Sequence, residues 1–186
     1  MNRIHLFAIA MTAALVTSAC GGAGWNPKAT DTAEPRVAAS PDAALTLERF
    51  RKLDPGAETF FDGAYGFVVF PTVGKGGVGI GGAYGEGEVY EQNVLVGTAT
   101  LTQLTVGFQL GGQSYSEVIF FRDRQTLDDF RNGNFELGAQ ASAVAVTAGA
   151  STDAAYDGGV AVFTIAKGGL MYEATVAGQK FGYEPI

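Results

Sequence analysis

Short apolar runs, many of them alternating with polar residues, make up most of the chain after residue 66. Alternation with a period of two is clearest at 98–102 and 144–147, and Gly or polar turn residues separate the runs. This pattern is typical of strands that are half-buried in a sheet. We therefore predict about eight to ten strands. They are expected within the runs 67–72, 77–85, 86–92, 94–101, 102–112, 116–122, 140–151, 159–166, 169–177 and 179–185.

Residues 41–53 instead place apolar side chains at helical spacing. Those apolar positions are Ala43, Leu47, Phe50 and Leu53. Ser40 precedes the segment as a candidate N-cap, and Pro41 occupies the first helical position, where an N–H group is not needed. The Asp-Pro-Gly sequence at 54–56 is typical of a helix end. The sequence thus predicts a helix with one apolar stripe.

Two shorter helices are predicted at 57–62 and 123–131. In the second, Asp123 can act as the N-cap, and Gly133 ends the helix. The fold class is therefore mainly β with flanking helices (α+β). We expect an antiparallel curved sheet or a closed β-barrel-like domain, with one or two N-terminal helices and one inserted helix. Curvature or closure removes exposed sheet edges, and 27 glycines permit the bends.

The start of the chain has the layout of a secretory signal peptide. Arg3 supplies a positive charge, an apolar run extends over 4–16, and small residues at 17–19 precede Cys20, the one cysteine. The run is too short to span a bilayer as a helix. The small-small-Cys ending resembles a lipobox, although a threonine stands where Leu is usual. We predict a signal peptide at 1–19 and lipid attachment at Cys20. An ordinary signal peptide with a chance cysteine is the alternative, and it would leave an odd thiol.

Residues 20–40 are small, polar and Pro-containing, which predicts a flexible tether. A folded, β-rich domain is expected at 41–186. Lipid attachment predicts a bacterial cell-envelope protein that is held at a membrane through Cys20. Gly21 after the cysteine follows the sorting convention for the outer membrane, so we expect the domain to face the periplasm.

The charge balance and the scarcity of reactive side chains narrow the possible functions. The chain has 12 Lys and Arg against 19 Asp and Glu, a net charge of −7; loss of Arg3 would leave 11 against 19, or −8. Nucleic acid is not an expected partner, because phosphate binding requires clustered positive charge. His5, the one histidine, would leave with the signal peptide. That loss excludes Ser-His-Asp, Cys-His and histidine-ligated metal chemistry, and we expect no catalysis, cofactor or metal.

Two motifs among the predicted strands could suggest catalysis. Residues 77–82 match G-x-G-x-x-G, but a dinucleotide site requires a following helix, and the next residues are typical of a strand. Glu86 and Glu88 would share one face of a strand, and Glu91 would lie on the other. Paired carboxylates could serve hydrolysis or bind a cation. We favour a glycine-bent strand and a solvated acidic face, which need no further assumption.

Four basic residues are candidates for binding an anionic group. Lys75 and Lys167 each precede Gly-Gly in a predicted turn and follow similar apolar sequences. Backbone N–H groups beside an ammonium group could bind a small anion, and two neighbouring hairpins could bring both lysines to one head group. Arg49 and Lys52 lie on the predicted helix away from its apolar stripe and could face a membrane. The alternative is that all four are ordinary solvated residues.

Four blocks in a fixed order resemble the SYLF domain family. They are Lys-Gly-Gly at 75–77, Gly-Phe-Gln-Leu-Gly-Gly-Gln at 107–113, Gly-Ala-Gln-Ala-Ser at 138–142 and Gly-Gly-Leu-Met at 168–171. The resemblance covers roughly 41–186. It implies a lipid-binding module that contacts membranes through its N-terminal helix and basic positions; eukaryotic members bind phosphoinositides, and some bind actin. This chain departs from them in its negative charge and in lacking an SH3 domain. Export would also place actin and phosphoinositides out of reach.

We therefore expect an envelope lipoprotein with a non-catalytic, SYLF-like domain. Its expected ligand is an anionic phospholipid or another envelope amphiphile. The expected head-group contacts come from Lys75, Lys167, Arg49 and Lys52. Two alternatives stay open: a small transmembrane β-barrel, and a hydrolase that uses Asp62 or the paired glutamates.

Replacing Cys20 by Ser tests the predicted anchor. The thiol is the group that lipidation modifies, so Cys20→Ser should block cleavage by the lipoprotein peptidase and leave a longer precursor. Gel migration and membrane fractionation of the variant expressed in a bacterial host would measure this. Normal maturation of Cys20→Ser into the same fraction would contradict the prediction.

Overall fold

The structure is a computed structural model that describes residues 38–107, 112–135, 137, 143–145, 151, 154–168, 176 and 178–186. Three α-helices, one 3₁₀ helix and six strands are described within these ranges. They are α1 (Pro41–Leu53), η1 (Pro55–Ala57), α2 (Glu58–Gly63), β1 (Gly66–Glu91), β2 (Val94–Gly107), β3 (Gly112–Phe121), α3 (Arg124–Arg131), β4 (Val144–Ala145), β5 (Val160–Gly168) and β6 (Gln179–Pro185).

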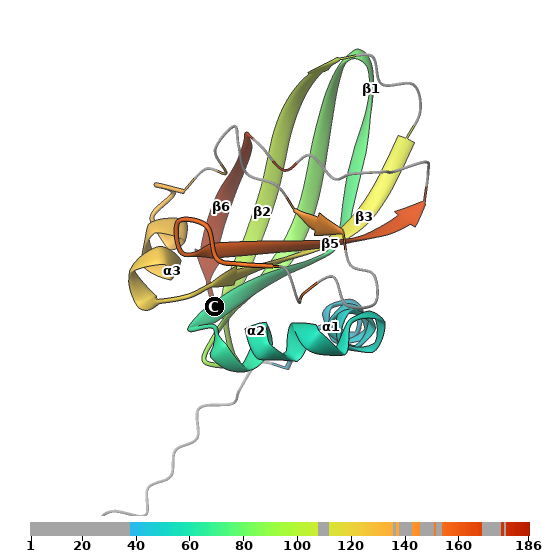
Figure 1. The fold of residues 1–186 in the computed structure, drawn as a ribbon. Helices are drawn as coiled ribbons and strands as arrows, with labels where there is room; N and C mark the ends of the chain where they lie inside the picture. Colours follow the sequence, from blue (N-terminus) through green and yellow to red (C-terminus); the bar gives the residue numbers. More distant parts are fainter. Residues whose placement is uncertain are drawn as a thin grey trace, which may run out of the picture. The chain divides into compact units, whose positions relative to one another are not determined.

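The described strands form one sheet in the order β4-β5-β3-β1-β2-β6 (Figure 1). All neighbouring strands are antiparallel except β4 and β5, which are parallel. Helices α1 and α2 lie together on one side of this sheet. The predicted fold class, mainly β with flanking helices, is confirmed. Among the described residues, no helix is long and apolar enough to cross a membrane.

Strand β1 doubles back on itself, so its two halves lie side by side (Figure 1). Its first half pairs with β3 and its second half pairs with β2. Tyr65 directly precedes β1 and Gln92 directly follows it, and the Gln92 N–H donates to the Tyr65 carbonyl at 3.0 Å. Within β1, a Cβ atom at Gly87 would lie 2.6 Å from the Val69 carbonyl oxygen. Only glycine therefore fits where these two backbones approach.

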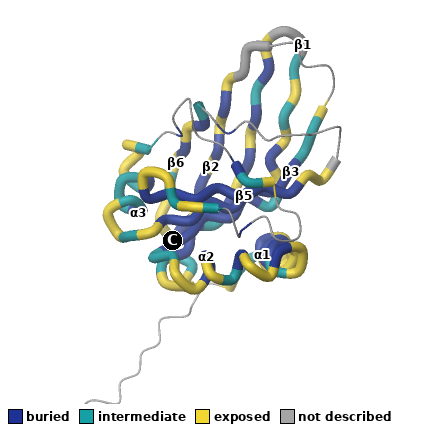
Figure 2. The backbone as a smooth tube through the Cα atoms, in the orientation of Figure 1, coloured by how far each residue is buried: buried dark blue, intermediate teal, exposed yellow. Residues whose placement is uncertain are grey.

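Side chains of the central strands alternate between two covered faces. In β1, Phe67 and Val69 pack with the apolar side chains of α1 and α2, on what we call the α1 face. Val68 and Phe70 pack on the opposite face with side chains of α3. Strands β3 and β5 divide their side chains in the same way. Figure 2 shows the consequence: the strands are buried where they cross the centre of the domain.

The sheet curves until its β6 edge reaches over β3. In the sheet, β1 and β2 separate these two strands. Nevertheless, the Gln179 side chain of β6 donates to the Tyr115 hydroxyl of β3 at 3.2 Å. Phe181 of β6 likewise lies 5.9 Å from Phe70 of β1, between ring centroids. The face opposite α1 is thus the concave face. Of the two predicted arrangements, the described strands form a curved open sheet, with β4 and β6 at its edges.

The helix ends agree with the sequence prediction. Ser40 caps α1 by accepting the Ala43 N–H at 3.2 Å, and Asp123 caps α3 by accepting the Thr126 N–H at 3.0 Å. Gly133 follows α3 with a φ of +69°, a conformation that favours glycine. The predicted apolar stripe of α1 is wrong at its last position. Leu53 is 39% exposed, because η1 turns the chain away there.

Several predicted strand boundaries are wrong. β1 includes three predicted runs, and β2 joins 94–101 to the start of 102–112. The Gly-Lys-Gly-Gly sequence at 74–77 was expected to form a turn, but residues 74–76 pair with β3 instead. Glycine is compatible with extended backbone as well as with turns, so composition did not decide this. Most of the run 169–177 and much of 140–151 lie outside the described residues.

Substitutions of glycine test whether β1 doubles back. Gly87→Ala should lower the free energy of unfolding by about 1–3 kcal/mol, because the new methyl group would overlap the Val69 carbonyl and the Phe70 ring. At Gly74, in the same strand, a Cβ atom would meet nothing within 4 Å. Gly74→Ala is therefore the matched control, with an expected change within about 0.5 kcal/mol. Urea denaturation measures both; equal effects would contradict this arrangement of β1.

Candidate functional site

Two of the predicted basic residues meet on the α1 face. The Arg49 side chain on α1 places Nη2 3.5 Å from the Ala166 carbonyl oxygen on β5. Lys167, the next residue on β5, donates from Nζ to Thr72 Oγ1 at 2.8 Å. Both basic side chains are exposed. We call Arg49, Lys167 and Thr72 the basic edge. It joins elements that lie far apart in the sequence, because α1 packs across the sheet.

The other two predicted basic residues lie on either side of this edge. Lys52 is exposed on α1, three residues after Arg49 and hence on the same side of the helix. Lys75 lies two residues beyond Val73, a residue of the concave-face cluster, and alternation therefore directs Lys75 toward that face. Burial lowers the pKa of the Lys75 amine. Lys75 and Lys167 flank β3 at the same end of the sheet. Their side chains lie on opposite faces, so the structure does not bring these two lysines to one head group.

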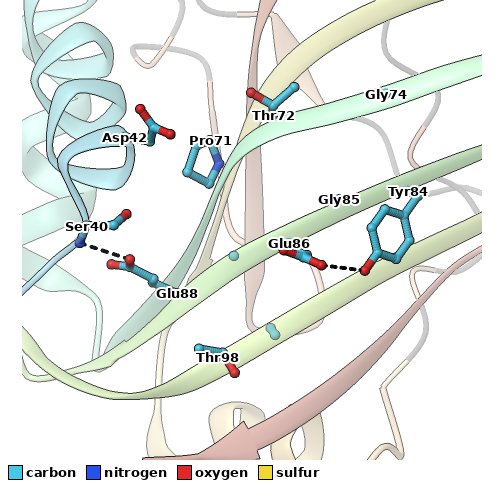
Figure 3. Close-up of a pocket in the computed structure, with 12 residues that line it drawn as sticks. Ser40, Asp42, Pro71, Thr72, Gly74, Tyr84, Gly85, Glu86, Glu88 and Thr98 are labelled. Carbon is cyan, nitrogen blue, oxygen red and sulfur yellow. Dashed lines mark hydrogen bonds between the residues drawn. The ribbon is translucent and has the colours of Figure 1, made fainter.

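An acidic groove lies beside the basic edge (Figure 3). Its cavity volume is about 690 Å³, and it is lined by the N-terminus of α1 and by β1 and β2. Asp42, Glu86 and Glu88 contribute carboxylates, and Thr72 belongs to both the groove and the basic edge. The α1 face therefore carries basic side chains at one end and carboxylates at the other.

The groove carboxylates hold the fold together. The Ser40 N–H donates to Glu88 Oε1 at 3.0 Å, which ties the start of α1 to β1. The Tyr84 hydroxyl donates to Glu86 Oε1 at 2.7 Å. Glu86 and Glu88 share this face as predicted. Asp62, the other carboxylate considered for hydrolysis, is exposed on α2 and does not line the groove.

Glu91 lies on the other face, as alternation predicted. It accepts the Tyr65 hydroxyl at 2.6 Å and the Arg131 guanidinium at 2.7 Å. The Tyr65 hydrogen bond and then the Arg131 hydrogen bond lower the pKa of the Glu91 carboxyl. This ion pair ties α3 to the end of β1. Within the described part of the chain, no three His, Cys, Asp or Glu side chains gather closely enough to hold a metal ion.

One carboxyl group that the sequence prediction missed is fully buried. Glu117 on β3 is 0% exposed, and its Oε2 accepts the Gln179 amide at 3.0 Å. Its Oε1 and the Gln179 Oε1 have no hydrogen-bond partner among the described residues. Burial raises the pKa of Glu117 to about 8, with the Gln179 hydrogen bond lowering it. The sequence contained one signal of this burial: Glu117 alternates with Tyr115 and Ile119 and so shares their face of an apolar strand.

Two comparisons with known proteins bear on the class of this domain. Residues 102–183 match the Ysc84 family model, described as Las17-binding protein actin regulator. The chain is also 30% identical over 165 residues to Beta cell expansion factor A of Aeromonas veronii, a match that covers 84% of this chain and 59% of that relative. The resemblance to the SYLF (Ysc84) family that the sequence blocks predicted is thus confirmed, with the family model matching residues 102–183. The chain spans little more than half the length of that curated relative.

The buried carboxyl group predicts a pH dependence of stability. Because the pKa of Glu117 is about 8 in the folded state and near 4.5 ordinarily, the folded protein holds a proton that the unfolded chain releases between these values. Stability from this group is therefore complete below about pH 4.5 and falls as pH rises toward 8. The loss should be on the order of a few kcal/mol.

Glu117→Gln removes the titration while keeping the shape of the side chain. The difference in unfolding free energy between the original protein and Glu117→Gln should therefore change between pH 5 and pH 8.5, with the variant relatively more stable at the higher pH. Urea denaturation across this range measures the difference. A difference that is independent of pH would show that Glu117 is not buried as a neutral acid.

Proposed function

We propose that this protein is an envelope lipoprotein whose SYLF domain binds anionic lipid head groups at the basic edge. The observation that carries this is that the exposed Arg49 side chain reaches the Ala166 carbonyl, next in the chain to the exposed Lys167. Lys167 lies inside the segment that matches the family model, residues 102–183, whereas Arg49 lies on α1, outside that segment. Guanidinium and ammonium groups bind phosphate oxygens through charge-assisted hydrogen bonds.

The distribution of charge makes the basic edge the place where an anionic surface could approach this chain. With a net charge of −7, the chain as a whole is repelled by an anionic surface. Arg51 does not offset this, because its guanidinium is 2.9 Å from Glu58 in an ion pair. Contact with anionic lipid therefore requires that the domain present the basic edge, with Lys52 beside it. Lys75, which faces the other way, would meet a head group separately.

Anchoring would set the orientation and the concentration of the domain at the membrane. A lipid on Cys20, with residues 20–40 as a tether, would hold the domain within reach of a bilayer surface. In this proposal the protein lies in the bacterial envelope, on the periplasmic side of the outer membrane. Such a location would exclude actin as a partner.

Charge reversal at the basic edge tests the proposal. The chain without residues 1–19 and carrying Cys20→Ser would be sedimented with phosphatidylglycerol vesicles, so that neither the predicted signal peptide nor the lipid anchor contributes. Arg49→Glu and Lys167→Glu should each weaken binding by about 1–2 kcal/mol, because each replaces an attraction by a repulsion. Added salt should weaken the binding of the parent chain, because exposed charges are screened.

Lys180→Glu is the matched control for the same experiment. Lys180 is exposed on β6, away from the basic edge, so the same change in net charge should have a smaller effect. Lys75→Glu reports whether the lysine on the other face takes part. Equal losses from all four reversals, or no preference over neutral phosphatidylcholine vesicles, would contradict a head-group site at the basic edge.

A further inference from the structure

Three large side chains are exposed near the bend of β1. Leu104 on β2 is 77% exposed, Ile80 on β1 is 67% exposed, and Tyr84 on β1 is 52% exposed. We call these three residues the apolar tip. Large apolar side chains that cluster on a surface, rather than occurring singly, usually mark a site of interaction.

The strand register explains why these side chains gather. Leu104 is directly opposite Gly82 in the antiparallel pairing of β1 with β2. Gly82 has no side chain, and Ile80 and Tyr84 lie two residues to either side of it, on the same face. Leu104 is therefore the diagonal neighbour of both, at a distance that long side chains can bridge. Glycine at position 82 leaves Leu104 uncovered.

The surrounding sequence carries no charge. Residues 94–116 contain no Asp, Glu, Lys or Arg, and neither do residues 76–85. In a chain with 31 charged residues among 186, this leaves one end of the β1–β2 pair free of ionic groups. The carboxylate that follows along β1 is Glu86, six residues beyond Ile80, or roughly 20 Å along a strand. The groove carboxylates are thus set back from Ile80, and Tyr84 joins the groove to the apolar tip.

We propose that the apolar tip inserts into the interfacial region of a lipid bilayer. This rests on the proposed function, because the bilayer is the surface whose head groups the basic edge would bind. Lys75 lies on the other half of β1, one residue before the uncharged stretch, where an ammonium group would meet the head groups. Tyr84, with its hydroxyl held by Glu86, would lie at the boundary, where aromatic rings with a polar end are favoured.

Two physical limits favour a bilayer over a second copy of the chain. A stable protein interface buries about 800 Å² on each partner, far more than three side chains supply. Two copies would also repel each other, since each carries a net charge of −7. Insertion must be shallow, because strand edges cannot leave backbone groups unpaired in hydrocarbon. Burial of side chains to about 5–10 Å, at the boundary of the acyl chains, meets this condition.

A fluorophore at the tip can report insertion directly. In the chain without residues 1–19 and carrying Cys20→Ser, Leu104→Cys provides the one thiol for labelling with an environment-sensitive nitrobenzoxadiazole group. Addition of vesicles of phosphatidylglycerol and phosphatidylcholine should shift its emission to the blue, and lipids with a spin label on the acyl chain should quench it. The matched control is Val94→Cys, at the opposite end of β2 and 38% exposed.

A label at Leu45→Cys separates the tip from the first helix. Leu45 is 64% exposed on α1, so a shift there without a shift at position 104 would overturn the proposal. Equal shifts at 94 and 104 would also overturn it, as would a shift at 104 that depends on protein concentration without vesicles. A shift at 104 that exceeds the shift at 94 supports insertion of the tip.

The unlabelled chain distinguishes failure of the tip from failure of the basic edge. Leu104→Ser should weaken partitioning onto anionic and neutral vesicles alike by roughly tenfold, since one large apolar side chain is no longer buried. Val94→Ser should leave partitioning unchanged. If anionic vesicles are bound but Leu104→Ser has no effect, the basic edge alone accounts for binding and the tip proposal is wrong. If no vesicles are bound, both proposals are wrong.

Discussion

Aromatic packing between the short helices and the sheet holds both the groove and the basic edge in place. The Phe60 ring of α2 contacts Phe163 of β5 edge-on, with centroids 4.9 Å apart, and Phe61 meets Phe120 of β3 at 4.8 Å. These contacts fix α2, and through it α1, across the strands. Arg49 then lies at the end of β5. Loss of this packing would separate the basic edge although every charge remained in the sequence.

Curvature of the sheet makes the second core possible. Because β6 reaches over β3, the concave face buries apolar side chains of both strands together with Leu127 and Phe130 of α3. The same curvature encloses Glu117 with Gln179, a polar pair in an otherwise apolar cluster. A buried acid that stays neutral is compatible with this core, whereas an ionised one is costly without a positive partner. The concave face is therefore the part of the domain whose stability depends on pH.

The proposed membrane contacts lie at positions with different chemistry. Arg49 and Lys167 supply positive charge on the α1 face, and Leu104 lies in an uncharged stretch near the bend of β1. The acidic groove lies between these two surfaces; it shares Tyr84 with the tip and Thr72 with the basic edge. The basic edge would attract the head groups of an anionic bilayer, and the apolar tip would enter the boundary of its acyl chains. Net negative charge elsewhere disfavours other orientations.

Local chemistry in the sequence determined the helix boundaries and the faces of the strands. The caps Ser40 and Asp123 act on groups three residues away, and the alternation that separated Glu88 from Glu91 is a property of any extended backbone. The ordered glycine-rich blocks were sufficient for the family. In contrast, the strand at Lys75 was predicted as a turn, because the glycines around it permit both a turn and a strand.

Only the tertiary structure decided which distant residues meet. Arg49 and Ala166 are 117 positions apart, and their approach depends on how the helices pack across the sheet. The doubling back of β1 exposes Leu104 above Gly82, and the curvature of the sheet buries Glu117 against β6. Residue types and spacing do not encode these distances directly. They follow from burying both faces of one curved sheet at once, which is a property of the whole domain.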